Sequence, residues 1–294
     1  MIDLHCHILP GIDDGAADGS VALAMARAAA ADGITIVACT PHILPGLYHN
    51  TGPQIRQAVA QLQHTLDQEG IPLRLVAGAD NHVVPDFVAS LRSGRLLTLG
   101  DTRYVLVEPP HHVVPPRLEE FFFNLTASGY VPILTHPERL TWLKSHYSTV
   151  CRLGEAGAWM QVTAGSLAGA FGRNAQYWAE RMLDEGRVHI LATDAHDLER
   201  RPLHLSKARD IAAERVGPVE AEHLVVTRPR GVLENVSPSS LPGPAAAGAS
   251  SNSAHAKGPA SATRFVAEGL DPAVHDRAAD GQRHVAHGLR RLFN

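Results

Sequence analysis

Short apolar runs alternate with longer amphipathic stretches along most of the chain. Most of the short runs are continuously apolar, which is typical of parallel strands that are covered on both faces. We predict strands at Ile2–His7, Ile34–Thr40, Leu73–Ala79, Arg103–Glu108, Val131–His136, Ala158–Thr163 and Val188–Asp194. Between these runs the pattern predicts helices at Ser20–Ala31, Gln54–Glu69, Asp86–Ser93, Arg117–Ser128, Ser145–Glu155, Asn174–Glu185 and Leu203–Arg215.

The order of these elements indicates the fold class. Four predicted helices are followed by glycines at the positions that helix C-caps favour, Gly33, Gly70, Gly129 and Gly186. Alternating strands and helices imply a parallel sheet, either open or closed into a barrel. Seven such units over about 220 residues favour an α/β barrel related to the eightfold one.

The composition changes at Ser237 and suggests a domain boundary there. From Ser237 to Ala262 the only large apolar residue is Leu241, and most positions are Ala, Gly, Ser or Pro. Such a segment buries too little surface to offset the entropy of ordering it. We therefore predict a barrel domain over residues 1–236, a flexible linker over 237–262 and a C-terminal tail over 263–294. The tail is interpreted either as a short amphipathic docking segment or as a disordered end.

Charge and hydropathy exclude several classes of protein. The 294 residues carry a formal net charge of -4, which is not the basic footprint of a nucleic-acid-binding protein. No apolar run approaches the roughly 20 residues that a membrane-spanning helix needs. The first residues lack the basic and apolar regions of a signal peptide. We expect a cytoplasmic protein that is not an integral membrane protein and binds no nucleic acid.

Histidine is frequent, with 18 residues, and its placement indicates chemistry. His5 and His7 lie on the first predicted strand and point to the same side, because side chains alternate along a strand. Two imidazoles that converge near a strand end can hold a metal ion. Asp13 and Asp14 follow in the next loop and add carboxylates on that side.

The same pattern repeats at the ends of later strands. Six of the seven predicted strands end in, or are followed at once by, His, Asp or Glu: the later ones are His42, Asp80, Glu108, His136, Asp194 and His196. The carboxyl ends of barrel strands meet at one rim, where such enzymes carry their active sites. Nitrogen and oxygen donors suit Mn, Fe, Zn or Co. We therefore predict a polynuclear metal site for hydrolysis, with Arg139, Arg200 and Arg201 as candidates for holding phosphate.

Other catalytic signatures are absent. Three cysteines, Cys6, Cys39 and Cys151, are too few and too scattered for a disulfide framework. None of them has an arginine six residues downstream, so the Cys-x5-Arg loop of thiol-based phosphatases is missing. No Gly-x-x-x-x-Gly-Lys-Ser/Thr loop occurs, which argues against a P-loop nucleotide site.

The opening of the chain resembles a known superfamily. Residues 2–15, Ile-Asp-Leu-His-Cys-His-Ile-Leu-Pro-Gly-Ile-Asp-Asp-Gly, look like the polymerase-and-histidinol-phosphatase (PHP) superfamily. More narrowly, they resemble bacterial manganese-dependent protein-tyrosine phosphatases of capsule and exopolysaccharide operons. Further matches stand, in the same order, at Thr40–His42, His136–Arg139, Gly165–Gly169, Phe171–Gly172 and Asp194–His196. The resemblance spans roughly residues 1–236.

This resemblance implies a fold, a site and a reaction. The fold would be a distorted (β/α)7 TIM-like barrel of the PHP type with a flexible C-terminal tail. The site would hold three divalent ions, Mn²⁺ first, with Fe, Co or Zn as alternatives. Arg139 and Arg201 would hold the phosphate of phosphotyrosine, which metal-activated water would hydrolyse. The implied metal ligands are His5, His7, Asp14, His42, Asp80, Glu108, His136, Asp194 and His196.

The resemblance also implies a partner, and it leaves alternatives open. The substrate would be a membrane-associated tyrosine autokinase that controls polysaccharide synthesis, and the tail could contact that kinase or a membrane surface. Asp80 departs from the family pattern, since a bridging Glu is expected there and Asp has a shorter reach. The alternatives are a PHP-type small-molecule phosphatase acting on histidinol phosphate, a phosphodiesterase and, more remotely, a non-catalytic metal-binding adaptor.

Overall fold

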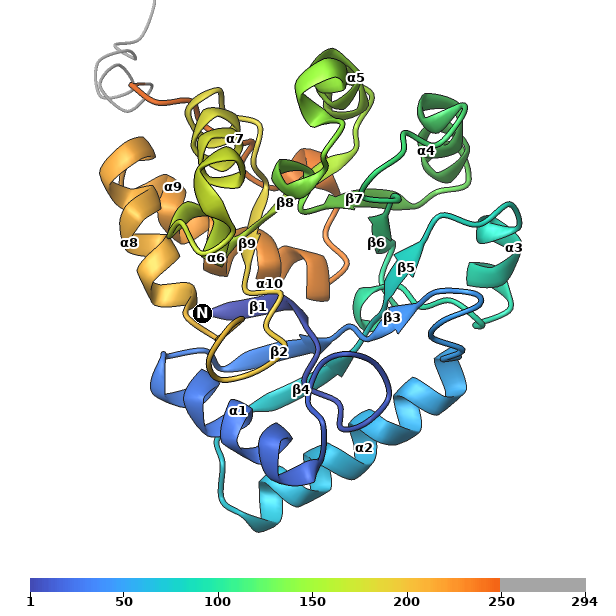
Figure 1. Cartoon of the computed structure of the whole chain (residues 1–294), viewed down its shortest axis with the longest axis vertical. Coiled ribbons are helices and arrows are strands. Elements are labelled where there is room, and N and C mark those ends of the chain that lie inside the picture. The colour runs from blue at the N-terminus through green and yellow to red at the C-terminus, as the bar shows by residue number, and fades with distance from the viewer. Residues whose placement is uncertain (249–294) are drawn as a thin grey trace, which may run out of the picture. The chain divides into compact units, whose positions relative to one another are not determined.

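The computed structural model describes residues 1–248, and in this range a parallel sheet curls into a distorted α/β barrel (Figure 1). This confirms the predicted fold class. The strands of this part of the chain are β1 Ile2–Cys6, β2 Ile36–Cys39, β3 His42–Ile43, β4 Arg74–Ala77, β5 Asp80–His82, β6 Tyr104–Glu108, β7 Val131–Thr135, β8 Trp159–Thr163 and β9 Ile190–Ala192. The predicted C-terminal tail, 263–294, lies outside the described residues.

The nine strands of residues 1–248 occupy seven positions around the barrel, because two of the seven predicted strands are each divided in two. One sheet has the order β1-β2-β4 and the other has the order β3-β5-β6-β7-β8-β9, with every neighbouring pair parallel. β3 continues β2 after a short break, and β5 continues β4 in the same way. β9 and β1 meet through two backbone hydrogen bonds, from His7 N to Ala195 O at 2.9 Å and from Asp194 N to His5 O at 2.8 Å.

Most of the helices lie around the outside of the curled sheet (Figure 1). Asp18 caps the first of them, since its carboxylate accepts hydrogen bonds from the backbone of Ser20 and Val21. The seven predicted helices are α1 Gly19–Ala31, α2 Gly52–Gln68, α3 Phe87–Arg92, α4 Leu118–Ala127, α5 Leu143–Glu155, α7 Gly172–Asp184 and α8 Leu205–Val216. Shorter helices were not predicted: α6 Ala164–Leu167, α9 Pro218–Glu222 and α10 Arg228–Leu233.

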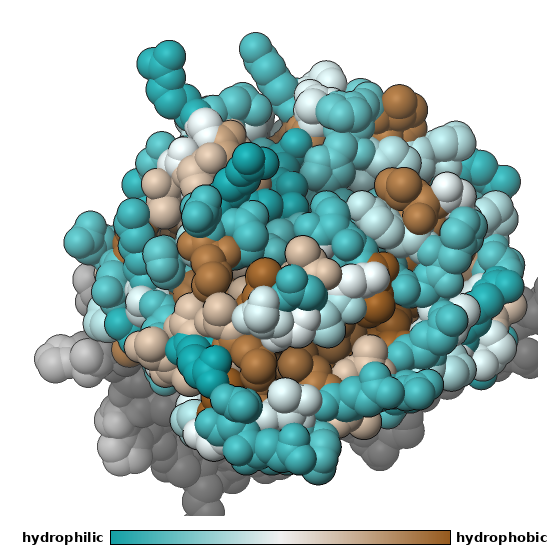
Figure 2. Space-filling model, turned by 60° about the horizontal axis from the view of Figure 1, so that its bottom comes forward, coloured by the Kyte–Doolittle hydropathy of each residue, from teal (hydrophilic) through white to brown (hydrophobic). Residues whose placement is uncertain are grey.

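Two apolar clusters account for the stability of this arrangement. One cluster fills the barrel with alternate residues of the strands, for example Tyr104 and Leu106 of β6, and Val232 of α10 joins it. The larger cluster lies between the strands and the surrounding helices. Hydrophilic residues predominate on the face in Figure 2, where hydrophobic ones form a smaller patch. No helix within residues 1–248 has both the length and the apolar character needed to cross a bilayer.

The first part of the predicted linker packs against the barrel. Leu241 contacts Gly231 so closely that a side chain at that glycine would overlap it. The buried guanidinium of Arg228 donates to the carbonyl oxygens of Pro242 at 2.7 Å and Gly243 at 2.8 Å. The prediction of a flexible linker that begins at residue 237 is therefore wrong for residues 237–248. Composition alone could not reveal that one leucine and a set of backbone carbonyls suffice to dock this segment.

Candidate metal centre

An irregularity in β1 turns the first two histidines into the barrel. Between Asp3 and Cys6 the strand advances three residues, while β2 advances only two between Val37 and Cys39. This bulge reverses the side-chain alternation. Leu4 packs inside the barrel and Cys6 packs in the outer cluster, so His5 and His7 also point inward.

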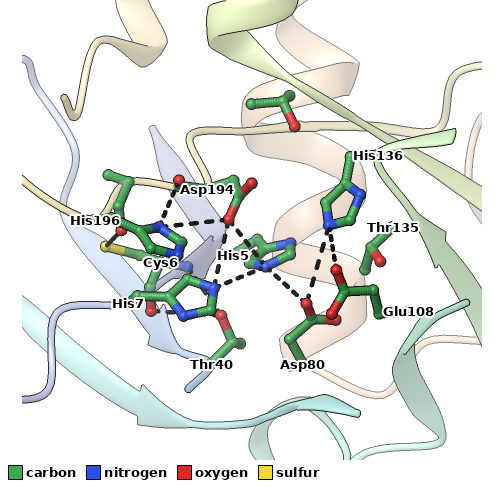
Figure 3. A network of polar contacts seen from close by, with 12 residues as sticks. His5, Cys6, His7, Thr40, Asp80, Glu108, Thr135, His136, Asp194 and His196 are labelled. Atoms are coloured by element: carbon green, nitrogen blue, oxygen red, sulfur yellow. Dashed lines mark hydrogen bonds and ion pairs between the residues drawn. The ribbon is translucent and has the colours of Figure 1, made fainter. Parts of the chain in front are cut away.

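The structure brings all nine predicted ligand residues together at the carboxyl ends of the strands. Figure 3 labels all of them except Asp14 and His42. Most of them are deeply buried, whereas the side chain of Asp14 is 47% exposed and marks the open side of the site. Their donor atoms fall into overlapping groups in which every atom lies within 4.8 Å of the others. Three of these groups consist of predicted residues only: His7, Asp14, His42 and His196; His5, His7 and Asp80; His5, His136 and Asp194.

Distances between histidine nitrogens and carboxylate oxygens distinguish two kinds of contact. Nδ1 of His7 lies 2.7 Å from Oδ2 of Asp13, which is a hydrogen bond that orients the ring. Ring nitrogens of three other predicted ligands keep a larger separation from the carboxylates that they face. His5 Nε2 lies 3.4 Å from Asp194 Oδ1, His42 Nε2 lies 3.5 Å from Asp14 Oδ1, and His196 Nε2 lies 3.5 Å from the same oxygen. Donors bound to one ion at about 2.1 Å are separated by about 3.0–3.4 Å.

Unpaired polar atoms support the same interpretation. Buried donor and acceptor atoms almost always have hydrogen-bond partners. In this cluster several have none within the described residues, among them both carboxylate oxygens of Asp80, Oδ1 of Asp194 and Nε2 of His196. These atoms point at the centre of the cluster, so the residues present fit divalent cations.

The two arginines predicted to hold phosphate meet at one carboxylate. Arg139 and Arg201 each donate a hydrogen bond to Oδ2 of Asp194. The guanidinium of Arg139 also lies over the ring of Phe171, 4.4 Å from its centroid. Arg200, the third candidate, is exposed and takes no part in this arrangement.

Backbone strain marks the same place. His136 and Asp194 adopt left-handed conformations, with φ of 33° and 50°. Residues other than glycine pay for this conformation in free energy, and such residues cluster at functional sites. Each one directly follows or closely follows the end of a strand, β7 or β9, and the turn aims its side chain at the centre.

Electrostatics keep the carboxylates ionised. Burial alone would lower the pKa of His42, but Asp80 and Glu108 outweigh it and raise that pKa to about 11. Burial would raise the pKa of Asp194, yet His5 and Arg201 hold it well below its usual range. Burial, reinforced by His7, lowers the pKa of His196 to about 4. Ionised carboxylates and imidazole nitrogens therefore face one another at the centre, and together they are a donor set for divalent cations.

Sequence reasoning missed several residues that support the centre. Oε1 of Gln161, on β8, accepts a hydrogen bond from Nδ1 of His5 at 2.9 Å. This bond orients the ring so that Nε2 faces the carboxylates. Glu138 is buried and accepts hydrogen bonds from Thr163 N and Ser166 Oγ, which fixes the loop that carries Arg139. A polar residue inside an otherwise apolar strand was the available signal for Gln161.

Two histidines next to Glu108 were also missed. His111 Nε2 lies 3.0 Å from Glu108 Oε1, and His82 Nε2 contacts Glu108 Oε2. His82 follows Asp80 by two residues on the same strand, so the spacing Asp-x-His was a visible signal. His111 lies in the loop after β6, whose path the sequence pattern did not predict.

Comparison with known proteins identifies the family. Residues 1–234 match the family described as capsular polysaccharide synthesis, CpsB/CapC. The chain belongs to the CpsB/CapC family. It is 38% identical over 217 residues to the tyrosine-protein phosphatase YwqE of Bacillus subtilis (strain 168), which covers 74% of this chain and 85% of YwqE. The resemblance predicted from the sequence motifs is thereby confirmed.

Other members of the family agree. The chain is 26% identical over 238 residues to the tyrosine-protein phosphatase CpsB of Streptococcus pneumoniae, covering 79% of this chain and 98% of CpsB. A solved structure from work on YwqE and CpsB, described as metal-dependent tyrosine phosphatases, superimposes with a TM-score of 0.77 at 36% identity. That match covers 81% of this chain and 96% of the other.

Proposed function

We propose that this member of the CpsB/CapC family hydrolyses phosphotyrosine in a protein with the help of about three divalent ions, Mn²⁺ first. The observation that carries the proposal is the set of unpaired donors in the cluster. Nitrogen and oxygen atoms from strand ends far apart in the sequence face one centre at separations that suit shared cations. The nine predicted residues, His5, His7, Asp14, His42, Asp80, Glu108, His136, Asp194 and His196, hold these ions.

Residues of this chain divide the remaining work. When bound, divalent cations lower the pKa of water and neutralise charge that develops on phosphorus. Arg139 and Arg201, held together by Asp194, bind phosphate oxygens in the forked geometry that guanidinium groups provide. Asp13 and Gln161 keep the rings of His7 and His5 in the orientation that presents Nε2 to the centre.

Thiol chemistry has no support in this site. Burial raises the pKa of both Cys6 and Cys39, so neither forms a thiolate readily. Cys6 packs in the outer cluster, on the opposite side of β1 from His5 and His7. Hydrolysis therefore proceeds without a cysteinyl-phosphate enzyme, and thiol alkylation leaves the activity intact.

The physiological substrate is a membrane-associated tyrosine autokinase of a capsule or exopolysaccharide system, met on the cytoplasmic side. Two facts support this choice: the family description names capsular polysaccharide synthesis, and the named relatives are tyrosine-protein phosphatases. The exposed side of the centre at Asp14 suits a phosphorylated chain segment that reaches the metal rim.

A substrate panel tests the proposal. Full-length protein reconstituted with Mn²⁺ is assayed on a phosphotyrosine peptide, on histidinol phosphate and on a dinucleotide, and kcat/KM is compared. We expect the phosphotyrosine peptide to be preferred. Preference for histidinol phosphate would favour a small-molecule phosphatase, and preference for the dinucleotide a phosphodiesterase. Metal binding without turnover of any substrate would indicate a non-catalytic adaptor.

A further inference from the structure

His82 lies within the candidate metal centre, although it is not among the nine ligands predicted from the sequence. It is the last residue of β5 and shares the inward face of that strand with Asp80, two residues earlier. Its ring lies 5.2 Å from that of His42, and its side chain is only 15% exposed. The histidine is therefore held inside the cluster and is not a surface residue beside it.

Three donor atoms converge at this point. His42, His82 and Glu108 each offer an atom within 4.8 Å of the other two. Nδ1 of His42 lies 3.3 Å from Oε2 of Glu108, and Nε2 of His82 contacts the same oxygen. All three atoms are buried, and none has a hydrogen-bond partner within the described residues. Buried atoms in this state point to a missing partner, and a cation suits an imidazole nitrogen together with a carboxylate oxygen.

The protonation of the His42 ring determines whether His42 or His82 supplies the nitrogen that binds this cation. A neutral imidazole has one nitrogen with a free lone pair, and the other nitrogen carries the proton. Nε2 of His42 faces Asp14 at 3.5 Å, within the separate group that also contains His7 and His196. If Nε2 serves that group, Nδ1 carries the proton and faces the carboxylates of Asp80 and Glu108, at 3.4 and 3.3 Å. His82 is then the nitrogen ligand on the Glu108 side.

We propose that His82 Nε2 and Glu108 Oε2 bind a further divalent cation, beyond those held by the nine predicted ligands. An imidazole and a carboxylate suit ions such as Mn²⁺, Co²⁺ and Zn²⁺. Because the protein supplies few donors here, the remaining positions are open to water or to phosphate oxygens, and the ion exchanges more readily than its neighbours. This inference rests on the proposed function, since it adds a ligand to the same centre.

Metal stoichiometry tests the inference directly. Full-length protein is stripped with a chelator and dialysed against a series of free Mn²⁺ concentrations, and bound ions per chain are counted by elemental analysis. Three proteins are compared: wild type, His82→Ala, and His112→Ala, which removes an exposed histidine of the same rim. We expect His82→Ala to lose the weakest-bound ion, with affinity reduced at least about tenfold, while His112→Ala matches wild type.

A second variant covers the case in which His82→Ala does not fold. His82→Cys retains a donor, so with Co²⁺ it should show a thiolate-to-metal charge-transfer absorption that wild type lacks. Equal Mn²⁺ content and affinity in wild type and His82→Ala, or no such absorption in His82→Cys, would overturn the inference. In that event metal-dependent phosphotyrosine hydrolysis by wild type would leave the proposed function standing. A wild type that binds no Mn²⁺ would overturn both.

Discussion

Arg139 and Arg201 donate to the same oxygen of Asp194, although 62 positions separate them in the chain. Their loops follow different strands, β7 and β9, and only the curvature of the sheet brings them together. The ring of Phe171 adds a shared support, since both guanidinium groups lie over it, at 4.4 and 5.9 Å from its centroid. Under the proposed function, these two fixed cationic forks beside the predicted metal ligands bind the phosphate.

The arginine pair predicts a specific kinetic effect. Arg139→Lys and Arg201→Lys keep the positive charge but lose the planar fork that binds two phosphate oxygens. We expect each to lower kcat/KM for a phosphotyrosine peptide by about 10²-fold, with bound metal unchanged. Arg200→Lys is the matched control, because Arg200 is exposed, and it should retain wild-type kinetics. Equal losses in all three variants would contradict the assignment.

Asp80 lies nearer to some of the predicted ligands than to others. Its Oδ2 lies 3.4 Å from His42 Nδ1 and 3.6 Å from His5 Nε2, but 4.0 Å from His136 Nε2. A longer carboxylate should come closer to His136, so we expect Asp80→Glu to bind Mn²⁺ at least as tightly as wild type. Asp80→Asn removes the negative charge at nearly constant shape and should lose metal affinity and kcat by orders of magnitude. Wild-type metal content in Asp80→Asn would rule out a ligand role.

His189 predicts how stability depends on pH away from the metal centre. Burial, assisted by the charge of Arg228, lowers its pKa to about 3 in the folded protein, against about 6.5 when unfolded. The unfolded chain therefore binds the proton more tightly. The contribution of His189 is complete above pH 6.5 and is lost as the pH falls toward 3, by about 1.4 kcal/mol per pH unit.

Urea unfolding at pH 7 and pH 5, with chelator present, measures this effect. The free energy of unfolding of wild type should fall more steeply between these pH values than that of His189→Gln, which cannot be protonated. His64→Gln, a substitution of an exposed histidine, serves as the control and should keep the wild-type slope. The same slope in His189→Gln and wild type would show that the buried ring does not control this dependence.

The segment after the barrel predicts a pair of truncations. A chain of residues 1–248 retains Leu241 and the carbonyl groups that Arg228 binds, so it should unfold at the same temperature as the full-length protein. A chain of residues 1–236 exposes apolar surface around Gly231 and leaves Arg228 without these acceptors. We expect it to be less stable by about 2–4 kcal/mol. Equal stability of the two chains would show that residues 237–248 do not contribute.

The convergence of the predicted ligands could be foreseen from the sequence, because parallel strands share one carboxyl edge. The positions of the strand ends were enough to predict Glu108, His136 and Asp194. Alternation from the start of the strand would turn His5 and His7 away from the barrel interior. They point inward because a bulge after Asp3 reverses which side chains face the interior. A bulge depends on the pairing with β2 and leaves no local signal in the chain.

Residues from loops and linkers were harder to predict. His111 reaches Glu108 because the loop after β6 folds back over the rim, and that path depends on tertiary contacts. Gln161 and Glu138 act through other residues, so no ligand pattern indicates them. Residues 237–248 were predicted to be a linker from their average composition. Such an average does not show that the buried Arg228 binds backbone carbonyl oxygens of this segment.

The proposed hydrolysis depends on divalent cations at the cluster, and one measurement tests this most directly. Purified full-length protein is analysed for bound metal and for phosphotyrosine-peptide hydrolysis, before chelation, after chelation and after addition of Mn²⁺. We predict more than one bound ion per chain at the start, loss of both metal and activity with chelator, and recovery of both with Mn²⁺. Full hydrolysis by protein that elemental analysis shows to be free of metal would contradict the account.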